Sequence, residues 1–513
     1  MTTNANLYAI LREAFWPAAD RPALIEAGGA TLTYGDLDRL SARFAGALAV
    51  RGVGPGDRVV VQADKSPGHV ALFLAVLRLG AVHVPLNTGY TAGELAYFLD
   101  NAEPRVLVCR PEATGTLDPV ARTAGLSGAA ALGTDDRSGL WAEALQTVPR
   151  GAIEPRDAED LASIIYTSGT TGRSKGAMLS HGNLAFTTRT LHRLWGFAPD
   201  DVMLHVLPIF HVHGLFFGLL TSFLNATPIL FHRTFDAEAA RRDLAGATVF
   251  MGVPTHYGRL LDLPGFGVED CATMRLFVSG SAPLTAQAWT AWQTRTGHAI
   301  LERYGMSEAG VITSNPLDGA RVPGTVGFAF PHTDVVVADG EGREVPRGQI
   351  GVVEARGPGL FKGYWRMPDK TAEDHRADGF FITGDNGVMD AEGRLTIVGR
   401  AKDLIISGGY NIYPKEIEAV LDAIDGVKES AVIGAPHGDL GEGVVAILVA
   451  QGQPVDMGEP VDMGVIQAAL DDALARFKHP RVFYWVDALP RNTMGKVQKS
   501  VLRDLYRTAY AKD

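Results

Sequence analysis

The sequence predicts an α/β fold in two unequal parts, a large N-terminal domain with more than one sheet and a small C-terminal α+β domain. A chain of 513 residues is too long for one compact core, so two or more domains are expected. Strand and helix patterns alternate through the first part, which is typical of parallel sheets covered by helices. The composition changes near residue 400. We therefore expect domains at 1–400 and 401–513.

The first part of the chain reads as β-α-β units. A helix begins after Thr33, because apolar residues then recur at spacings of three and four up to Gly52. Thr91 and Glu94 have the spacing of a capping box and begin another helix. The other elements expected here are strands at 58–62, 82–86 and 105–109 and a helix at 69–79. Residues 111–158 have weak periodicity and are expected to be a surface connection with helix.

The later elements follow the same alternation. A buried strand at 249–253 is expected to run into a helix at Pro254, and a strand at 274–278 into a Gly/Ser turn. The predicted small domain has strands at 404–406, 429–434 and 443–450 and helices at 414–424 and 465–477.

Composition excludes several classes of protein. The net charge of -11 leaves no basic surplus for general nucleic-acid binding. Cys109 and Cys271 are the only cysteines, so neither a disulfide framework nor a zinc site is indicated. The N-terminus lacks a signal-peptide pattern, and no window has the apolar length of a membrane span. We expect a cytoplasmic monomer or weak homodimer without membrane insertion.

The most informative segment is a polar loop after a buried strand at 162–166. Residues 167–174 include no apolar side chain, and Lys175 follows them. Glycines let the backbone approach an anion, hydroxyls donate hydrogen bonds, and the lysine adds charge, so the loop suits phosphate better than an ordinary solvated turn. It does not match the P-loop pattern, because the lysine follows Arg-Ser. The candidate phosphate ligands are Thr167, Ser168, Gly169, Thr170, Thr171, Gly172 and Lys175.

This loop, YTSGTTGRSKGAMLSH, resembles the phosphate loop of the adenylate-forming superfamily, which includes acyl-CoA synthetases, peptide-synthetase adenylation domains and firefly-type luciferases. The resemblance covers about residues 30–505, with the signature segments in the expected order. It implies the adenylate-forming enzyme fold, with a small domain that is mobile about a hinge near Lys402. It also implies ATP and Mg²⁺ as cofactors and CoA as a co-substrate.

The resemblance assigns nucleotide contacts to four segments. Tyr304 matches the aromatic ring that stacks on adenine, and Ser307 matches a hydroxyl near the α-phosphate. Glu308 matches the carboxylate that binds magnesium, and we add Thr167 as a second candidate magnesium ligand. Asp385 and Arg400 match the ribose contacts, and one carboxylate can accept both hydroxyls of a diol. The remaining residues of these nucleotide-binding segments are Ser279, Gly280, Ser281, Ala282, Glu302, Arg303, Gly305 and Met306.

The resemblance also implies the residues for catalysis and thiol transfer. Lys496, in the run PRNTMGKV, matches the mobile catalytic lysine. His211 belongs to an aromatic and histidine segment beside the acyl pocket, and we include it with the catalytic residues. The loop that would line the pantetheine tunnel comprises Ser407, Gly408 and Gly409.

The acid is indicated by the segments SGSAPL, LERYGMSE, RVPGTVG and PRNTMGKVQK, which look most like those of malonyl-CoA synthetases. Malonate has a second carboxylate, and its burial requires a cation. Arg259 is the first candidate for this cation, and Arg275 is the second. The alternative for Arg259 is an exposed arginine on a helix with no binding role. Val212 and Met306 are expected in the acyl pocket. Methylmalonate is the expected secondary substrate, because one methyl group discriminates weakly.

Four alternatives remain. An acyl-CoA ligase for a short-chain, medium-chain or aromatic monocarboxylate would share the nucleotide motifs, as would a luciferase-like oxygenase. A peptide-synthetase adenylation domain is less favoured, because no fused carrier segment is expected after Lys496. A non-catalytic AMP-binding sensor predicts loss of Lys496 or Glu308, and both are present.

Overall fold

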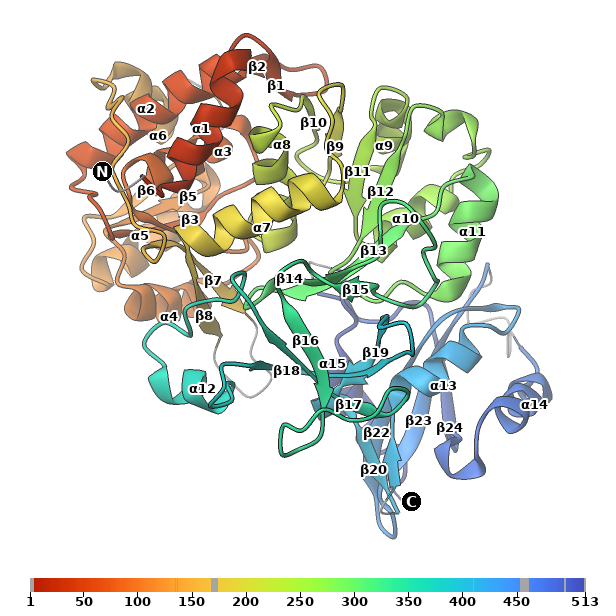
Figure 1. The fold of residues 1–513 in the computed structure, drawn as a ribbon. Helices are drawn as coiled ribbons and strands as arrows, with labels where there is room; N and C mark the ends of the chain where they lie inside the picture. Colours follow the sequence, from red (N-terminus) through yellow and green to blue (C-terminus); the bar gives the residue numbers. More distant parts are fainter. Residues whose placement is uncertain are drawn as a thin grey trace.

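The computed structural model describes residues 4–133, 135, 137–167, 174–408, 410–452, 461–492 and 495–511. In this part of the chain the strands form four sheets (Figure 1), of six, nine, four and five strands. The six- and nine-stranded sheets lie side by side in the large domain, and the five-stranded sheet belongs to the small domain. None of the helices in these ranges combines the length and apolar character that a bilayer crossing requires.

The six-stranded sheet confirms the predicted β-α-β units. Its order is β6-β5-β3-β4-β7-β8, and all neighbours are parallel except β7 and β8. The strands are β3 (Arg58–Gln62), β4 (Val82–Pro85), β5 (Val106–Cys109), β6 (Ala129–Ala131), β7 (Leu161–Thr167) and β8 (Lys175–Ser180). The associated helices are α2 (Tyr34–Val50), α3 (Pro67–Arg78), α4 (Ala92–Ala102), α5 (Thr114–Thr123) and α6 (Gly139–Gln146). Capping boxes begin α2 at Thr33 and α4 at Thr91. The weakly patterned connection contains β6, a short alanine strand without a periodic signal.

The nine-stranded sheet carries most of the site. Its order is β15-β14-β13-β12-β11-β9-β10-β1-β2, and the pairs from β13 to β1 are parallel. The strands are β1 (Pro22–Ile25), β2 (Thr31–Thr33), β9 (Met203–His205), β10 (Ile229–Phe231), β11 (Val249–Gly252), β12 (Leu276–Ser279), β13 (Leu301–Met306), β14 (Gly310–Ser314) and β15 (Phe328–Ala329). The associated helices are α1 (Leu7–Phe15), α7 (His181–Leu194), α8 (Thr221–Leu224), α9 (Ala237–Leu244), α10 (Pro254–Leu261) and α11 (Ala286–Thr296). The carboxyl ends of the parallel strands share one edge, where ligands of such sheets bind.

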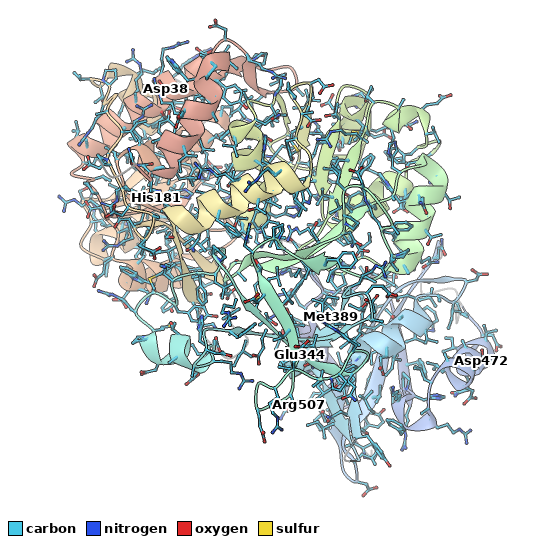
Figure 2. The ribbon with its side chains drawn as sticks, in the orientation of Figure 1. Asp38, His181, Glu344, Met389, Asp472 and Arg507 are labelled. Atoms are coloured by element: carbon cyan, nitrogen blue, oxygen red, sulfur yellow. The ribbon has the colours of Figure 1, made fainter. Side chains whose placement is uncertain are left out.

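Buried polar contacts join the N-terminal helix to its neighbours. The Asp38 carboxylate on α2 accepts hydrogen bonds from Tyr8 OH at 2.6 Å, Arg12 Nε at 2.8 Å and Arg78 Nη2 at 2.6 Å. The backbone N–H of Leu7 donates to Nδ1 of His181, at the start of α7, at 3.0 Å. Figure 2 labels Asp38 and His181 in this part of the molecule. Charged contacts therefore join α1, α2 and α3, and a neutral hydrogen bond joins α1 to α7, in addition to apolar packing.

Between β9 and α8 the chain forms a π-helix, η3 (His213–Leu220), whose residues are all buried. Two glycines permit its close packing. A Cβ on Gly214 would lie 2.2 Å from the Pro208 carbonyl oxygen, and one on Gly218 would lie 2.9 Å from the His205 ring. A π-helix has i→i+5 hydrogen bonds and is most often found at functional sites. The uniformly apolar sequence gives no sign of this geometry.

The antiparallel four-stranded sheet leads into the small domain. It comprises β16 (Asp334–Ala338), β17 (Ile350–Arg356), β18 (Phe381–Met389) and β19 (Leu395–Arg400), with α12 (Pro368–Glu373) between β17 and β18. A single 3₁₀ turn, η5 (Ala401–Asp403), holds Lys402 between this sheet and the next. The small domain comprises β20 (Ile405–Ser407), β21 (Tyr410–Ile412), β22 (Val427–His437), β23 (Gly441–Ala450), β24 (Val482–Val486), α13 (Pro414–Leu421), α14 (Met463–Ala473) and α15 (Lys499–Leu505). Figure 2 labels Asp472 and Arg507 in this domain.

Arg275 lies just before β12, at the amino ends of the parallel strands and so at the edge opposite the ligand edge. Its Nη2 and Nε lie 2.5 and 2.7 Å from the two carboxylate oxygens of Asp201, which is 1% exposed. The Asp201 carboxylate also accepts hydrogen bonds from Thr248 Oγ1 and the Ala198 N–H. This position is at odds with the acyl contact expected for Arg275, because its charge is already compensated by a partner 74 residues away.

We expect Arg275→Met to destabilise the protein by about 3 kcal/mol, because it leaves the buried Asp201 carboxylate without its cation. Chemical denaturation of the variant and the wild type measures the difference. Arg259→Met, which removes an exposed arginine, should change the free energy of unfolding by less than about 0.5 kcal/mol. Equal effects of the two substitutions would contradict a structural role for the Arg275–Asp201 pair.

Candidate functional site

The proposed ribose contacts meet where β18 and β19 pair. Asp385 lies opposite Arg400 in the register of these strands. Arg400 Nε lies 2.7 Å from Oδ1 of Asp385, and Tyr304 OH, from β13, donates to Oδ2 at 2.6 Å. The Asp385 carboxylate is buried, and its oxygens each have a further lone pair for a ligand hydroxyl. Three residues assigned separately from the sequence therefore form one connected group.

The proposed phosphate residues lie at the ends of the β7–β8 hairpin. Thr167 and Lys175 are opposite one another in its register. Lys175 Nζ lies 3.4 Å from Asp374 Oδ2 and 4.2 Å from the centre of the Tyr364 ring. The residues of the loop between the strands, Ser168, Gly169, Thr170, Thr171 and Gly172, lie outside the described residues. A cation from β8 and a hydroxyl from β7 thus flank the place where this loop begins and ends.

Glu308, in the turn between β13 and β14, connects the phosphate side to the nucleotide side. Its Oε1 accepts hydrogen bonds from Thr167 Oγ1 and Tyr364 OH, each at 3.3 Å. Burial raises the pKa of Glu308, whereas the nearby charges of Lys175 and Arg400 lower it. A carboxylate beside a hydroxyl suits Mg²⁺, which is usually bound by one or two carboxylates together with substrate phosphates. The described residues contain no group of three or more His, Cys, Asp or Glu that could hold a metal alone, so phosphate oxygens would complete the coordination.

The Gly/Ser turn after β12 forms the expected adenine side. Ser279 ends the strand, and Gly280, Ser281 and Ala282 follow it. Ser281 has a φ of 69°, a left-handed conformation that is uncommon for a non-glycine residue and is concentrated at functional sites. Its Oγ lies 3.2 Å from Nδ1 of His213, on the π-helix. The turn therefore touches the acyl side as well as the nucleotide side.

Glu302 and Arg303 follow each other on β13, so their side chains point to opposite faces of the sheet. Glu302 is buried, its Oε1 has no hydrogen-bond partner among the described residues, and burial raises its pKa to about 8. Farther along the strand, a Cβ on Gly305 would lie 2.0 Å from the Gly310 carbonyl oxygen, so glycine is required where β13 pairs with β14. Met306 and Ser307, which end the strand and begin the turn, are half-buried.

Arg303, which its sequence motif assigned to the nucleotide, lies between the π-helix and the Gly/Ser turn after β12. Its guanidinium lies 4.9 Å from the centre of the Phe217 ring, and it packs so closely on Gly280 that a Cβ there would lie 2.6 Å from Nε. The residue is 3% exposed, and in the described structure Nε and Nη2 have no hydrogen-bond partner. Burial lowers its pKa to about 9, so it remains a cation at neutral pH. Arg303 is thus a buried charge that no carboxylate of the described residues pairs with.

Lys496 and His211 share the electrostatic environment of Arg303. Burial and the charge of Arg400 lower the pKa of Lys496, and Arg303 lowers it further. Burial, Lys496 and Arg303 lower the pKa of His211 to about 3, so its imidazole is neutral at physiological pH. The Lys496 backbone N–H donates to Asn492 Oδ1 at 3.0 Å, which holds the lysine on its turn. The small domain therefore places its lysine beside the groups of the large domain.

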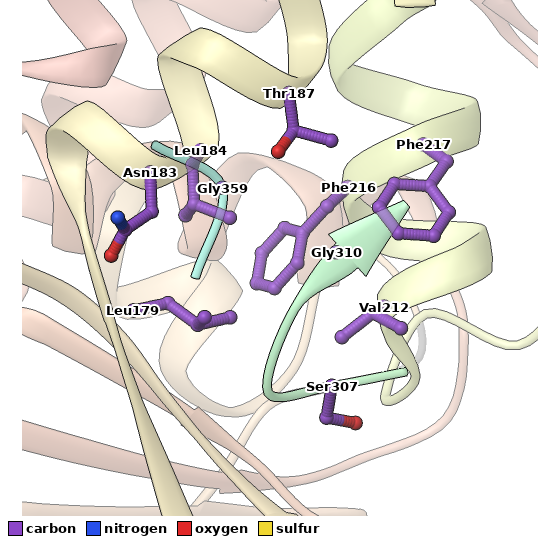
Figure 3. A pocket seen from close by; sticks show the side chains of 10 residues that line it. All are labelled: Leu179, Asn183, Leu184, Thr187, Val212, Phe216, Phe217, Ser307, Gly310 and Gly359. Carbon is purple, nitrogen blue, oxygen red and sulfur yellow. The ribbon is translucent and has the colours of Figure 1, made fainter. Parts of the chain in front are cut away.

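The acyl side is nearly filled by apolar side chains (Figure 3). A cavity of about 10 Å³, room for about one water molecule, is enclosed between α7, the π-helix and the turn after β13. Its lining residues are Leu179, Asn183, Leu184, Thr187, Val212, Phe216, Phe217, Ser307, Gly310 and Gly359. Val212, an expected pocket residue, is among them. A bulky acid has no space here in this arrangement of the side chains.

Arg259 and the proposed CoA segment lie at the periphery of the site. Arg259 is exposed on α10. Burial of His256 lowers the pKa of that histidine to about 3, and the charge of Arg259 adds to this shift. Burial lowers the pKa of Lys402 in η5. Ser407 is buried at the end of β20, and Gly408 has a φ of 56°. Gly409 lies outside the described residues.

The sequence did not predict the contacts that the structure gives to Tyr364, His213 and Phe217. It also did not predict Arg303 as a cation on the acyl side. Tyr364 follows β17 in the chain and carries no motif. The signal for Arg303 was available, because consecutive strand residues face opposite sides and only one of Glu302 and Arg303 can face the nucleotide. The family resemblance indicates residues 216–219 as pocket wall or core, but the contact of Phe217 with Arg303 had no signal, since the apolar run 214–220 has no helical period.

Comparisons with known proteins show the family and the fold of this chain. The model of the family described as AMP-binding enzyme matches residues 12–365, and that of the AMP-binding enzyme C-terminal domain matches residues 416–496. The crystal structure of ATP-bound MatB from Rhodopseudomonas palustris is 48% identical, covers 99% of this chain and 100% of its own, and has a TM-score of 0.95. The apo structure of the same protein, at the same coverage and identity, scores 0.84. The overall structure of this chain is therefore more similar to the ATP-bound form.

Two curated relatives differ in the acid that their names state. A feruloyl-CoA synthase from Amycolatopsis is 35% identical, covering 93% of this chain and 94% of that protein. The mitochondrial malonate–CoA ligase ACSF3 from Bos taurus is 33% identical, covering 96% of this chain and 89% of that protein. Similar identities to ligases for different acids mean that overall sequence likeness leaves the acid open.

Glu302 should make stability depend on pH. Its folded-state pKa of about 8 lies above the ordinary range, so between pH ~4.3 and ~8 the folded chain keeps a proton that the unfolded chain releases, and stability falls as pH rises through this window. Glu302→Gln removes this effect. We expect the variant to lose less stability than the wild type between pH 6 and pH 9, measured by urea denaturation. Glu344→Gln, at an exposed glutamate, should behave as the wild type, and parallel losses in all three proteins would refute the shifted pKa.

Proposed function

The chain belongs to the AMP-binding family of adenylate-forming acid–thiol ligases, and on that basis we propose that it converts malonate, ATP and CoA to malonyl-CoA, AMP and diphosphate. Methylmalonate is the proposed secondary acid, because a single methyl group is discriminated by only about tenfold to two-hundredfold in such pockets. The observation that carries the proposal is the buried cation Arg303, which has no acidic partner among the described residues.

A buried charge without a partner is costly, and a substrate carboxylate would compensate it. Malonate has two carboxylates, one for activation and one to be bound. Arg303 shares an electrostatic environment with Lys496, the expected lysine of the adenylation step. A guanidinium can hold a carboxylate by two parallel hydrogen bonds, and Nε and Nη2 are the atoms left unpaired. A dianion with its charges one carbon apart fits between two such cations.

The scarcity of apolar space supports the same choice. The cavity beside Val212 and Ser307 measures only about 10 Å³, so any acid needs rearranged side chains there, and the rings of Phe216 and Phe217 form part of its wall. Malonate contributes a single methylene between its carboxylates and needs little apolar volume. Arg259, the first candidate from sequence, is exposed on α10, and the observations therefore favour Arg303 as the residue for the distal carboxylate.

In the first half-reaction a carboxylate oxygen of malonate attacks the α-phosphorus of ATP, and diphosphate leaves. Both reactants are anions, so the contribution of the protein is mainly positioning and charge neutralisation. We assign Lys496 to the carboxylate and α-phosphate, Asp385 with Tyr304 and Arg400 to the ribose, and the loop from Thr167 to Lys175 to the outer phosphates. Mg²⁺, held by Glu308 and the phosphates with Thr167 nearby, would neutralise phosphate charge when bound.

In the second half-reaction the thiolate of CoA attacks the carbonyl carbon of the adenylate, and AMP leaves. We propose that the small domain turns about Lys402 between the steps, withdraws Lys496 and presents the segment Ser407–Gly409 to the pantetheine arm. The position of Lys402 in a single turn between two sheets supports this hinge. Domain rearrangements of this kind are a common way to complete one catalytic site after another.

Arg303→Met should reduce kcat/KM for malonate about 100-fold or more and leave that for propanoate nearly unchanged, because only malonate uses the cation. Diphosphate release with ATP, Mg²⁺ and CoA is measured for malonate, methylmalonate, propanoate, butyrate, octanoate, benzoate and 4-coumarate. Arg259→Met is the matched control and should keep the wild-type order of acids. If wild type prefers a monocarboxylate, the malonate proposal fails; if Arg259→Met alone removes the malonate preference, the assignment to Arg303 fails.

Lys496→Ala should abolish adenylate formation and leave thiol transfer from a supplied malonyl-adenylate within about threefold of wild type, because the two steps use different faces of the small domain. The first step is followed by diphosphate release and the second by AMP release in single-turnover experiments. Equal loss of both half-reactions would rule out this division of roles.

A further inference from the structure

We propose that Lys65 and His205 are positioning residues for acid selection, which anchor the first turn of the π-helix η3 and thereby keep Phe217 beneath the Arg303 guanidinium. The inference rests on the proposed function, since it concerns how the cation for the distal carboxylate is held. Neither residue touches the nucleotide side of the site. Both lie behind the acyl side, at the junction of the two large sheets.

Lys65 is a buried lysine whose contacts are unusual. It is 7% exposed, and no carboxylate of the described residues pairs with it. Its Nζ lies 2.8 Å from Nδ1 and 2.9 Å from the backbone oxygen of His205, and 4.5 Å from the centre of the Phe231 ring. The amine is therefore surrounded by two acceptors and one aromatic face. Lys65 comes shortly after β3 of the six-stranded sheet and His205 ends β9 of the nine-stranded sheet, so the contact joins the sheets.

The lysine fixes the tautomer of His205. Because Lys65 donates to Nδ1, the proton of the neutral imidazole is on Nε2. Nε2 lies 2.9 Å from the backbone oxygen of Gly214, which can only accept a hydrogen bond. Burial lowers the pKa of Lys65, but a neutral amine still has two protons to donate, so the chain of contacts persists in either protonation state. The result is a directed series of hydrogen bonds from Lys65 through His205 to Gly214.

Gly214 is in the first turn of η3, where the backbone N–H of His213 also donates to Nδ1 of His211 at 3.3 Å. No side-chain hydrogen bond caps this helix at Val212, and the next carbonyl contact from a side chain is Ser222 Oγ to Gly218, farther along. A π-helix holds more residues per turn than an α-helix and is uncommon as a free choice of the chain. The imidazole of His205 also packs against Gly218, leaving no room for a Cβ. His205 therefore contacts η3 at two points along its length.

The hydrogen-bond register of η3 determines which side chain lies under the Arg303 guanidinium. Phe217 presents its ring 4.9 Å from the guanidinium, and His213 contacts Ser281 at 3.2 Å. If the segment relaxed to α-helical i→i+4 hydrogen bonds, each turn would hold about one residue fewer than in the π-helix. Phe217 would then rotate away from Arg303. The cation would then lose its aromatic support and its orientation toward the distal carboxylate. Acids without that carboxylate would be less affected.

The test compares Lys65→Met, which keeps the apolar stem and removes the donors, with Thr221→Val. Thr221 follows η3, and its buried Oγ1 has no hydrogen-bond partner in the described structure, so this matched control leaves the anchor intact. We expect Lys65→Met to lower the ratio of kcat/KM for malonate over propanoate at least tenfold, mainly through KM for malonate. Amide hydrogen exchange of residues 213–220 should become faster. Thr221→Val should change neither quantity.

A second pair of variants, at His205, keeps the test conclusive if Lys65→Met does not fold. His205→Gln keeps an N–H near the position of Nε2 and should retain most of the malonate preference, whereas His205→Leu should lose it. Unfolding midpoints are measured for every variant. Equal losses for malonate and propanoate, or unchanged exchange in residues 213–220, would overturn the inference. If Arg303→Met removes the malonate preference while Lys65→Met and His205→Leu keep it, only this inference fails. If Arg303→Met also keeps it, the assignment of the distal carboxylate to Arg303 fails and this inference fails with it, whereas the proposed function fails only if wild type itself prefers a monocarboxylate.

Discussion

Buried positive charge without matching acid is the constraint on which the site depends. Arg303 is surrounded by Phe217, Gly280 and neutral histidines, and Lys496 enters the same region from the small domain. Water cannot solvate these charges fully, so the free protein carries a cost that anionic ligands would relieve. The opposite arrangement holds on the nucleotide side, where the Asp385 carboxylate already receives Arg400 and Tyr304. The unmet charge thus lies on the side that we propose for the acid.

Packing keeps this charge in place. Glycines at 214, 218, 280 and 305 let backbone and rings approach one another more closely than any Cβ would permit. The π-helix, the turn after β12 and the strand β13 consequently form one tightly packed unit. Their contacts come from segments that are far apart in the sequence and meet only because parallel strands end at one edge.

Local patterns in the sequence predicted much of the fold. The capping boxes at Thr33 and Thr91, the strand at 58–62 and the helix at Pro254 need only neighbouring residues, and the structure confirms them. The π-helix could not be predicted, because its contacts with His205, and through it with Lys65, join segments far apart in the sequence. Arg275 gave a misleading signal, since its partner Asp201 is distant in the sequence. The direction of Arg303 was readable from strand alternation, but the motif to which it belongs suggested the nucleotide.

Arg400 and Lys402 are separated by one residue, although the first belongs to β19 and the second to the turn that leaves the large domain. A rotation that begins after Arg400 leaves the strand pairing of Arg400 with Asp385 undisturbed. The proposed ribose contacts and the proposed movement of the small domain would therefore be mechanically independent. An activated acyl group could stay bound through the change of domain arrangement, and a reactive mixed anhydride would be kept from water until the thiol arrives.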